Sequence, residues 1–467
     1  TAEITYAGSG GSPYKQGDTV TITATFTEAL TTTPKIAISG SGIADVVATD
    51  MSVGNTTLIW TYTYAVPAGD GTGTISLSVG TDASGNPITS APTSGDEFTV
   101  DNTAPTLEAV TQVPVNTNNN TPSYVFTTTE AGTLTSTLGL SSGNSVSSGS
   151  NTVTFSELTD GPYADQTVTV TDVAGNASSL TLTTFTVDTA SPTAAITYSP
   201  AGPYKNGQTV TITATFNGAV LDSPVPTIAI AGSGIANVTS TNMTKSSTTV
   251  YTYSYAVPTG DGTGTVTVGT GTDASANIVT SVPTSGATFT VDNTAPVLTA
   301  VTQVSTPSNT TTPSYVFTTT EAGTITTNIT EGFSTNASAA TGSNQTITFE
   351  TLGEGTYTGK TVTVTDVYGN AGSITMADFV IDTTAPTMTI TSTTSGVTDG
   401  STTNDTSITI VFVTSSSTSN FTVDDIDVIG GDLSSFTIVS SSIYTVIFTP
   451  TDDGATTIDV DAGAFTD

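Results

Sequence analysis

The chain consists largely of short runs in which apolar residues alternate with threonine. Residues 19–26 read Thr-Val-Thr-Ile-Thr-Ala-Thr-Phe, residues 209–216 repeat them letter for letter, and aromatic residues alternate in the same way at 60–64. A period of two residues predicts β-strands with one buried face, and threonine suits the solvated face. Turn residues such as Gly-Asp-Gly at 69–71 separate the runs. No stretch has a helical period, so the sequence predicts an all-β fold.

Two kinds of sequence unit alternate along the chain. Pro-Tyr-Lys-Gln-Gly at residues 13–17 returns as Pro-Tyr-Lys-Asn-Gly at 203–207, which marks unit A. A phrase at 122–132 returns unchanged at 313–323, which marks unit B. A different unit, called C, follows Asp382. The order is therefore A1, B1, A2, B2 and C, and such internal repetition is the signature of a repeat architecture.

Every unit boundary carries the same kind of short phrase. It reads Val-Asp-Asn-Thr-Ala-Pro at residues 100–105 and 291–296, with close variants at 187–192 and 381–386. A flexible linker would be longer and rich in Gly and Ser, so these phrases predict ordered joints. Units of about 85 to 105 residues with many short strands are typical of immunoglobulin-like β-sandwiches. We therefore expect a linear array of five such domains, at residues 1–101 (A1), 102–188 (B1), 189–292 (A2), 293–382 (B2) and 383–467 (C).

Several phrases in units B and C are more specific than a strand pattern. B1 carries Leu-Thr-Asp-Gly-Pro-Tyr and Thr-Val-Thr-Val-Thr-Asp-Val-Ala-Gly-Asn, and B2 matches both. These phrases resemble the bacterial Ig-like domains of large cell-surface adhesins and surface-layer proteins, and unit C resembles another branch of the same superfamily. The resemblance covers essentially the whole chain and implies an extracellular, cell-surface location, with most such domains serving as spacers. Its phrases lie at 158–163, 167–176 and 187–189 in B1, at 352–357 and 361–370 in B2, and at 421–426 and 459–467 in C.

The composition removes most enzyme classes. The chain has neither Cys nor His, which excludes disulfides, thiolate or His-ligated metal sites and the Ser-His-Asp triad. Thirty-nine acidic residues against five Lys and Arg give a net charge of −34, a sign that opposes binding to nucleic acid or to an anionic membrane. No stretch approaches the roughly 18 apolar residues of a membrane span. We therefore expect no enzyme, no nucleic-acid partner and no membrane span in this segment.

Acidic residues recur on both sides of the joints. In a seven-strand sandwich with alternating strand directions, the loops after the second and sixth strands face the preceding joint. In B1 the first of these loops holds Glu130 and the second holds Asp172 and Asn176, while the joint supplies Asp101 and Asn102. Calcium takes six to eight oxygen ligands from carboxylates, amides, backbone carbonyls and water. The sequence therefore predicts a Ca²⁺ site here, repeated in B2 as Asp292, Asn293, Glu321, Asp366 and Asn370.

The other joints carry incomplete versions of this set. Three departures distinguish them: residues 217–218 read Asn-Gly where A1 has Thr-Glu, Ala276 replaces a glycine, and unit C has hydroxyl residues at 414–418. We expect these joints to bind calcium more weakly, or to use Asp222 or Asp424 instead. The predicted ligands are Asp188, Asp273 and Asn277 before A2, and Asp382 before C.

Each of these acids also has a simpler interpretation. Asp and Gly-Asn are favoured turn residues without any metal. The recurrence of the whole set at the B units favours the metal site there, but both interpretations stay open.

Other candidate chemistry is less specific. Paired carboxylates at 424–425 and 452–453 could serve glycoside hydrolysis, but neighbouring acids on a strand point to opposite faces, so we interpret them as non-catalytic. Four tyrosines could form a sugar-stacking platform or pack in the domain cores; they are Tyr6, Tyr14, Tyr198 and Tyr204. Sequons, which are glycosylation candidates in a surface protein, begin at Asn55, Asn119, Asn176, Asn237, Asn242, Asn309, Asn328, Asn336, Asn344, Asn404 and Asn420.

The chain ends align with the middle of the repeat pattern. Residues 1–6 match residues 193–198, which directly follow a joint proline, and residues 464–467 resemble the run into an Asp-x-x-Gly-Asn loop. Unit C is thus short of its last strand, and an uncovered sheet edge is an aggregation hazard. We expect the chain to continue past both ends, or a neighbouring subunit to donate the strand.

These observations lead to one functional expectation and one alternative. The expectation is a structural segment of a cell-surface protein: a surface-layer subunit, a surface fibre or an adhesin stalk, built as a rod of Ig-like domains and stiffened by calcium at the joints. Its partners would be copies of itself or neighbouring domains of a longer chain. The alternative is an adhesive array that binds surface glycans or proteins, with specificity on one domain face.

Overall fold

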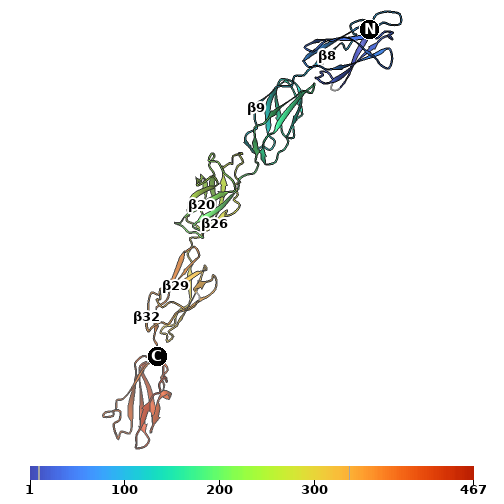
Figure 1. Cartoon of the computed structure of the whole chain (residues 1–467). Helices are drawn as coiled ribbons and strands as arrows, with labels where there is room; N and C mark the ends of the chain where they lie inside the picture. The colour runs from blue at the N-terminus through green and yellow to red at the C-terminus, as the bar shows by residue number, and fades with distance from the viewer. Residues whose placement is uncertain (9–10, 336) are drawn as a thin grey trace. The chain divides into compact units, whose positions relative to one another are not determined.

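The computed structural model describes residues 1–8, 11–335 and 337–467, so the sequon at Asn336 lies outside the described residues. Strands joined by turns make up the described chain, in which a 3-10 turn at Val423–Asp425 is the one helical element (Figure 1). The predicted all-β fold is confirmed. No helix in this part of the chain is long and apolar enough to cross a membrane. The chain divides into two compact units, residues 1–202 with 207–290, and residues 203–206 with 291–467.

The first compact unit begins with a sandwich of two four-stranded sheets, in the orders β1-β2-β6-β5 and β4-β3-β7-β8. In β2 the alternate residues Val20, Ile22 and Ala24 are buried while the threonines between them face outward, as the two-residue period predicts. The strands are β1 (Ala2–Gly8), β2 (Thr19–Phe26), β3 (Lys35–Ser41), β4 (Val46–Asp50), β5 (Ser52–Val53), β6 (Ile59–Ala65), β7 (Gly71–Ser78) and β8 (Glu97–Val100).

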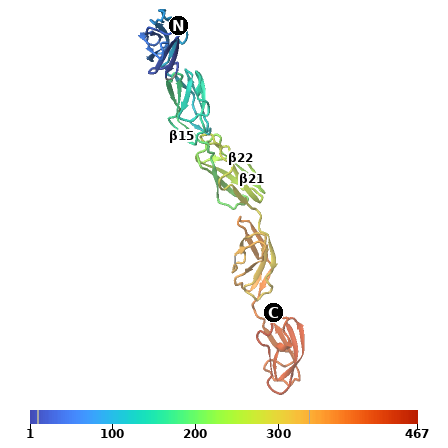
Figure 2. The same ribbon diagram turned by 90° about the vertical axis from the view of Figure 1, so that its right-hand side faces the viewer.

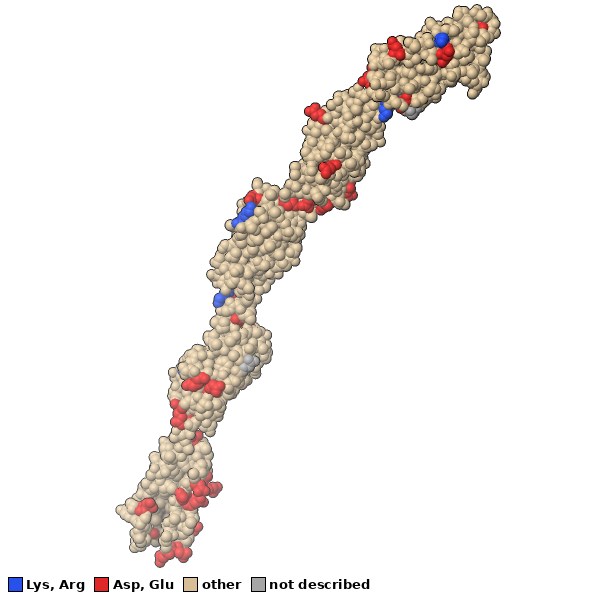
Figure 3. Space-filling model, viewed as in Figure 1, with Lys and Arg blue, Asp and Glu red and all other residues tan. Residues whose placement is uncertain are grey.

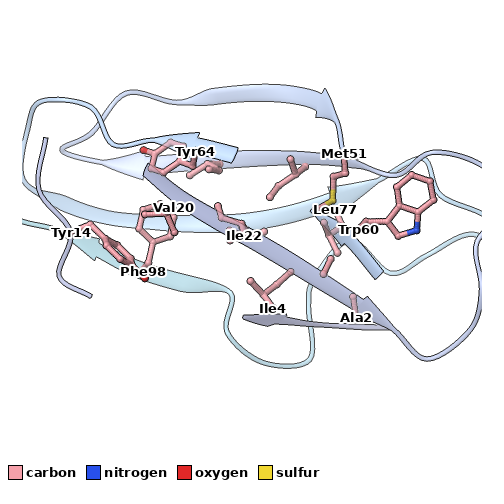
Figure 4. Close-up of a cluster of buried hydrophobic side chains, with 14 of the residues drawn as sticks. Ala2, Ile4, Tyr14, Val20, Ile22, Met51, Trp60, Tyr64, Leu77 and Phe98 are labelled. Carbon is pink, nitrogen blue, oxygen red and sulfur yellow. The ribbon is translucent and has the colours of Figure 1, made fainter. Parts of the chain in front are cut away.

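Aromatic side chains fill one end of this core. Tyr14 and Tyr64 lie around Phe98 in edge-to-face contacts, with ring centroids 6.3 Å and 5.3 Å from it (Figure 4). Tyr6 also packs on Phe98, and its hydroxyl donates to the backbone oxygen of Gly95. In A2 the hydroxyl of Tyr198 donates to Gly286 in the same way, and Tyr204 is buried. The structure therefore places these tyrosines in packing roles rather than on an open sugar-stacking surface.

Residues 107–187 form three smaller sheets around their own core, in the orders β14-β11-β9, β13-β12-β16-β17 and β10-β18-β15. Strands β11 and β16 carry fully buried residues such as Phe126 and Val170. The strands are β9 (Leu107–Thr111), β10 (Asn116–Thr117), β11 (Ser123–Thr128), β12 (Gly132–Ser136), β13 (Ser145–Val146), β14 (Gly149–Thr154), β15 (Gly161–Tyr163), β16 (Thr167–Asp172), β17 (Ala177–Thr181) and β18 (Phe185–Val187).

The A2 segment repeats the sheets of A1 strand for strand, in the orders β19-β20-β24-β23 and β22-β21-β25-β26. Figure 2 labels β21 and β22, which pair antiparallel with a bulge, as β3 and β4 do in A1. The strands are β19 (Ala194–Ser199), β20 (Thr209–Phe216), β21 (Thr227–Ser233), β22 (Val238–Asn242), β23 (Thr244–Lys245), β24 (Val250–Ala256), β25 (Gly262–Gly269) and β26 (Thr288–Val291).

The second compact unit contains the repeat of B1 and then unit C. The B2 sheets have the orders β27-β28-β31, β30-β29-β33-β34 and β32-β35, and the sheets of C have the orders β36-β37-β40-β39 and β38-β41. The strands are β27 (Leu298–Thr302), β28 (Ser314–Thr319), β29 (Gly323–Thr327), β30 (Ser338–Ala339), β31 (Gln345–Thr348), β32 (Gly355–Tyr357), β33 (Thr361–Thr365), β34 (Ala371–Thr375), β35 (Phe379–Ile381), β36 (Met388–Ser392), β37 (Ile408–Thr414), β38 (Asp427–Ile429), β39 (Gly431–Ser440), β40 (Ile443–Pro450) and β41 (Thr457–Asp459).

The candidate catalytic acid pairs are not on strands. Asp424 and Asp425 lie in the 3-10 turn, and Asp452 and Asp453 lie in a bend after β40. The premise that strand geometry points each pair to opposite faces is therefore wrong. The carboxylate of Asp425 instead accepts a hydrogen bond from the backbone N–H of Thr422, which caps the turn.

The joint phrases are ordered turns between strands. In each one the Asp side chain accepts a hydrogen bond from the backbone N–H two residues later, an Asx turn that explains why Asp recurs there. One carboxylate oxygen is thereby engaged locally. The N···O distances are 3.0 Å for Asp101 and Thr103, 3.1 Å for Asp188 and Ala190, 2.9 Å for Asp292 and Thr294, and 3.1 Å for Asp382 and Thr384.

Candidate metal centre

Three predicted acids converge at the joint before B1. Strand β11 ends just before Glu130, strand β16 ends at Asp172, and Asp101 follows strand β8. One carboxylate oxygen of each lies within 4.8 Å of the others. Asp172 is buried, and the other two side chains are partly exposed. Alternating strand directions therefore bring the two loops to the incoming joint, as the sequence predicts.

The same arrangement recurs in the second compact unit. Carboxylate oxygens of Asp292, Glu321 and Asp366 again lie within 4.8 Å of one another. Among the described residues, these two sets are the acidic groups of three or more that lie close enough to share an ion. Both precede a B unit, which matches the sequence-based expectation that the B joints carry the fuller set.

The carboxylate of Asp172 also organises its own loop. Its Oδ1 accepts hydrogen bonds from the backbone N–H of Gly175 at 2.7 Å and of Asn176 at 2.9 Å, while its Oδ2 accepts from the Asn176 amide at 2.9 Å. Each carboxylate oxygen offers about two acceptor sites. The turn role and a role as an ion ligand are therefore compatible in one side chain.

The Asn at the end of this loop connects it to the joint. The Asn176 amide nitrogen donates to the backbone oxygen of Asp101 at 3.0 Å. Equivalent bonds recur from Asn277 to Asp188 at 2.7 Å and from Asn370 to Asp292 at 2.9 Å, each between an amide nitrogen and a backbone oxygen. The structure thus uses these predicted ligands as donors that hold each loop against the incoming chain.

The Asn residues of the joint phrases serve the preceding domain. The Asn102 amide oxygen accepts from the backbone N–H of Gln16 at 2.5 Å, and its nitrogen donates to the backbone oxygen of Gly69 at 2.6 Å. The Asn293 amide oxygen accepts from the backbone N–H of Asn206 at 2.6 Å. Both amides therefore face the loop of the Pro-Tyr-Lys phrase, and the structure directs them away from the role of ion ligand.

Negative charge is concentrated at the B1 site. Burial raises the pKa of Glu130, and the charges of Asp101, Asp172 and Asp70 raise it further. Asp70 itself accepts a hydrogen bond from the Thr103 hydroxyl at 2.6 Å, which is the main cause of its lowered pKa. Burial and the neighbouring carboxylates both disfavour the charged form of Glu130, and a cation bound among these carboxylates would favour that form.

An all-oxygen donor set of this kind is compatible with calcium. Ligands at the 2.3–2.6 Å that calcium prefers lie at most about 5 Å apart, and the 4.8 Å limit seen here satisfies this. Zinc prefers the Cys and His that the chain lacks. Backbone oxygens and water would complete the coordination.

The joint before A2 has a different set of contacts. Asp273 is buried and accepts from the backbone N–H of Ser275 and Asn277, at 2.8 Å and 3.0 Å. Gly218 stands where the third acid would be, and the amide oxygen of the preceding Asn217 accepts from the backbone N–H of Thr193. The alternative ligand Asp222 is paired with Lys245 at 2.7 Å. The structure therefore gathers two acids at this joint rather than three.

The joint before unit C departs further. Glu354 accepts hydrogen bonds from the hydroxyl of Thr383, from the hydroxyl of Thr384 at 2.8 Å and from the backbone N–H of Thr383 at 3.1 Å, and these contacts lower the pKa of Glu354. In the loop after β37, the hydroxyl of Thr414 donates to the backbone oxygen of Ser416. Asp382 is therefore brought to no cluster of three acids in the described part of the chain.

Sequence reasoning missed the acids that hold three of the joint phrases from the preceding domain. The Thr189 hydroxyl donates to Asp160 at 2.9 Å, as the Thr103 hydroxyl does to Asp70 and the Thr384 hydroxyl to Glu354. The available signal was a turn acid about 30 residues before each joint threonine. Gly-Asp-Gly at 69–71 looks like an ordinary turn, so this second role is invisible without the structure.

The surface beyond these sites is mostly uncharged. In Figure 3 most of the visible atoms belong to neither acidic nor basic residues, in line with a chain of which 9% is charged. The few basic groups are all lysines. Strong charge is therefore local in this molecule, and the joint acids are part of it.

Two parts of the chain match family models described as bacterial Ig-like domain. One covers residues 110–189 and the other residues 382–467. Together with the sandwich sheets, these matches mean that the chain carries bacterial Ig-like domains in tandem. No curated protein matches it.

Solved structures with similarity to the chain are distant. An alpha-2-macroglobulin of Escherichia coli, activated by porcine elastase, is 10% identical over 96% of this chain, with a TM-score of 0.16; the match spans 50% of that protein's chain. A crystal structure of titin domains is 13% identical over 60% of this chain and 99% of its own, with a TM-score of 0.26. An ICAM-5 ectodomain fragment is 11% identical over 82% of this chain and 100% of its own, with a TM-score of 0.25. At TM-scores this low the similarities carry no argument about function.

Proposed function

We propose that the chain is a structural segment of a bacterial cell-surface protein in which calcium ions stiffen the A-to-B joints. The observation that supports this most is the convergence of the same three acids at two equivalent joints, Asp101, Glu130 and Asp172 in one and their repeat partners in the other. One acid of each set belongs to the joint and two belong to the following sandwich. An ion bound to all three would fix the joint against that sandwich.

The energetic effect of such an ion follows from linkage. An ion that binds only the ordered joint stabilises it by RT ln(1 + [Ca²⁺]/Kd), which is about 2.7 kcal/mol at a hundredfold excess over Kd. Without the ion, mutual repulsion of the three carboxylates opposes the same arrangement. The joint is therefore stiff in a calcium-rich medium and looser without calcium, as suits a protein that works outside the cell.

A spacer role accounts for the rest of the chain. Tandem Ig-like domains with short joints give reach to a surface layer, a surface fibre or an adhesin stalk, and an acidic, lysine-poor surface disfavours binding to nucleic acid and anionic lipid. The partners of such a segment are copies of itself or neighbouring domains of a longer chain.

Calcium titration of the full chain tests this function. Isothermal titration calorimetry with CaCl₂ should give two sites, and Glu130→Gln together with Glu321→Gln should weaken binding at both. Glu108→Gln removes the same kind of charge from exposed strand β9 and is the matched control. Small-angle scattering of the unmodified chain should show a smaller maximum dimension in EDTA than in calcium. Absent binding heat with an unchanged scattering profile would disprove the calcium role.

One observation favours the alternative of an adhesive array. Unit A1 has a polar depression of about 420 Å³ lined by Ser39, Thr72, Thr74 and Glu97. The repeat partner of Ser39 in unit A2 is Ala231, so the two copies differ at this face. Hydroxyl and carboxylate groups can bind a glycan, although ligand sites are usually more apolar. A glycan array probed with the full chain and with Glu97→Ala separates this function from a pure spacer.

A further inference from the structure

The Pro-Tyr-Lys phrase of the A units places a lysine at the joint. In A1 the ring of Tyr14 is buried against Phe98, and its backbone pairs with the end of β8 through a 2.9 Å hydrogen bond from the N–H of Asp101. The N–H of Gln16 bonds to Asn102. These contacts hold the loop on both sides of Lys15 and point the lysine beyond its own sandwich.

The lysine reaches the loop that carries the predicted ion ligand in the next domain. The Nζ of Lys15 donates to the backbone oxygen of Gly175 at 2.6 Å. In the second compact unit, the Nζ of Lys205 donates to the backbone oxygen of Gly369, the repeat partner of Gly175. Two of the chain's five basic residues are used in this way, and sequence reasoning assigned them no role.

A glycine suits the loop position that receives the lysine. Gly175 has φ +93° and Gly369 has φ +83°, in the left-handed region. A Cβ atom on them would lie 3.0 Å and 3.2 Å from the lysine Nζ atoms, which is too close without a shift. At the B1-to-A2 joint the equivalent residue is Ala276, whose backbone oxygen accepts from the amide of Asn118 at 3.3 Å. Where the loop residue is glycine, the donor that reaches it is a lysine, and where it is alanine, the donor is an asparagine amide.

We propose that Lys15 and Lys205 are interdomain latches that keep the A-to-B joints closed without calcium. A hydrogen bond from a charged donor is shorter and roughly twice as strong as a neutral one. The A-to-B joints therefore have a strong latch, whereas the B1-to-A2 joint has a neutral amide in its place. The amide-to-backbone bond made by the loop Asn is common to these three joints, so the lysine latch is the hydrogen bond across the joint in which they differ. The three joints between A and B units accordingly fall into two classes, and of these the B1-to-A2 joint bends first.

Spin-label distances across individual joints test the latch. The chain has no Cys, so pairs of introduced cysteines can be labelled selectively in the full protein. Exposed pairs are Ser52→Cys with Thr135→Cys across the A1-to-B1 joint, Thr135→Cys with Thr241→Cys across the next, and Thr241→Cys with Thr326→Cys across the A2-to-B2 joint. Measurement in EDTA makes the result independent of calcium binding, which calorimetry tests separately.

The latch predicts how the width of the spin-label distance distribution differs from joint to joint. In EDTA the distance distribution should be broadest across the B1-to-A2 joint. Lys15→Met, which keeps the apolar stem and removes the donor, should lower the closed-to-open equilibrium constant of the A1-to-B1 joint about tenfold and leave the B1-to-A2 and A2-to-B2 joints unchanged. Lys205→Met should do the same at the A2-to-B2 joint only. Lys35→Met, which breaks the ion pair with Asp50 inside A1, is the control and should change no joint.

Three results would overturn the proposal. One is an unchanged A1-to-B1 distribution in Lys15→Met together with an unchanged A2-to-B2 distribution in Lys205→Met. Another is equal broadening by Lys35→Met, which would mean that loss of any positive charge suffices. The third is an unmodified chain in which all three joints are equally broad in EDTA.

Discussion

Replacing Glu130 by Gln separates the metal site from the turn interpretation, because the two predict different effects in calcium and in chelator. The substitution keeps the size of the side chain and its position after β11, and it removes one of three carboxylates that lie within 4.8 Å of one another. Two like charges at that separation repel by about 1 kcal/mol in water-like surroundings and by more at lower dielectric. In EDTA the variant should therefore be more stable than the unmodified B1 domain by about 1 kcal/mol.

In calcium the variant loses more stability through weaker ion binding than it gains through reduced repulsion. At a hundredfold excess over Kd the unmodified site gains about 2.7 kcal/mol over its value in EDTA. A site with two carboxylates binds more weakly, so the gain of the variant should fall below about 1 kcal/mol. The quantity to compare is the increase in the free energy of unfolding of B1 between EDTA and calcium. The change in carboxylate repulsion is already present in the EDTA value, so it drops out of this difference.

Hydrogen exchange measured by mass spectrometry on the full chain gives the increment domain by domain. Peptides that cover β16 report on B1, and peptides that cover β33 report on the untouched B2 site; Ala174 and Tyr368 make the two distinguishable. The increment should fall in β16 and persist in β33. An equal increment in both, or the same loss of stability in calcium and in EDTA, would mean that Glu130 is a turn residue and the metal interpretation is wrong.

Three further predictions concern pH, the core and a close backbone approach. The pKa of Glu130 is raised in folded, metal-free B1, so this group lowers the stability of B1 increasingly as pH rises from its pKa in the unfolded chain through its pKa in the folded domain. Protons compete with calcium for the same carboxylate, so calcium affinity should fall on acidification from pH 7 to pH 5. A pH-independent Kd in calorimetry would contradict this. Phe126→Ala truncates a fully buried ring and should destabilise B1 by about 3–5 kcal/mol. The control Val110→Ala, at an exposed position, should cost less than about 0.5 kcal/mol. Urea unfolding monitored by hydrogen exchange measures both. Gly71→Ala would place a Cβ 1.6 Å from the backbone oxygen of Ser41, so it should lower the melting temperature of A1, whose only Trp, Trp60, gives a fluorescence readout; an unchanged transition would contradict the close approach.

Much of the fold and part of the site could be predicted from the sequence because they depend on periodicity. Alternation of apolar residues with threonine predicts strands in which every second residue is buried, as β2 and β20 both show. Repetition places the same strands twice, and alternating strand directions bring the loops of Glu130 and Asp172 to one end of the sandwich. These inferences need only the residue order and the two-residue period.

Only the tertiary structure decides which atoms of those residues face each other. The amide of Asn102 turns back to its own domain, the amide of Asn176 donates across the joint, and Lys15 reaches a glycine 160 residues away. A hydrogen bond depends on distances of a few tenths of an ångström and on the direction of each donor. Residue type and spacing identify which groups come to a joint, whereas the orientation of two packed loops determines whether each group serves as ligand, donor or latch.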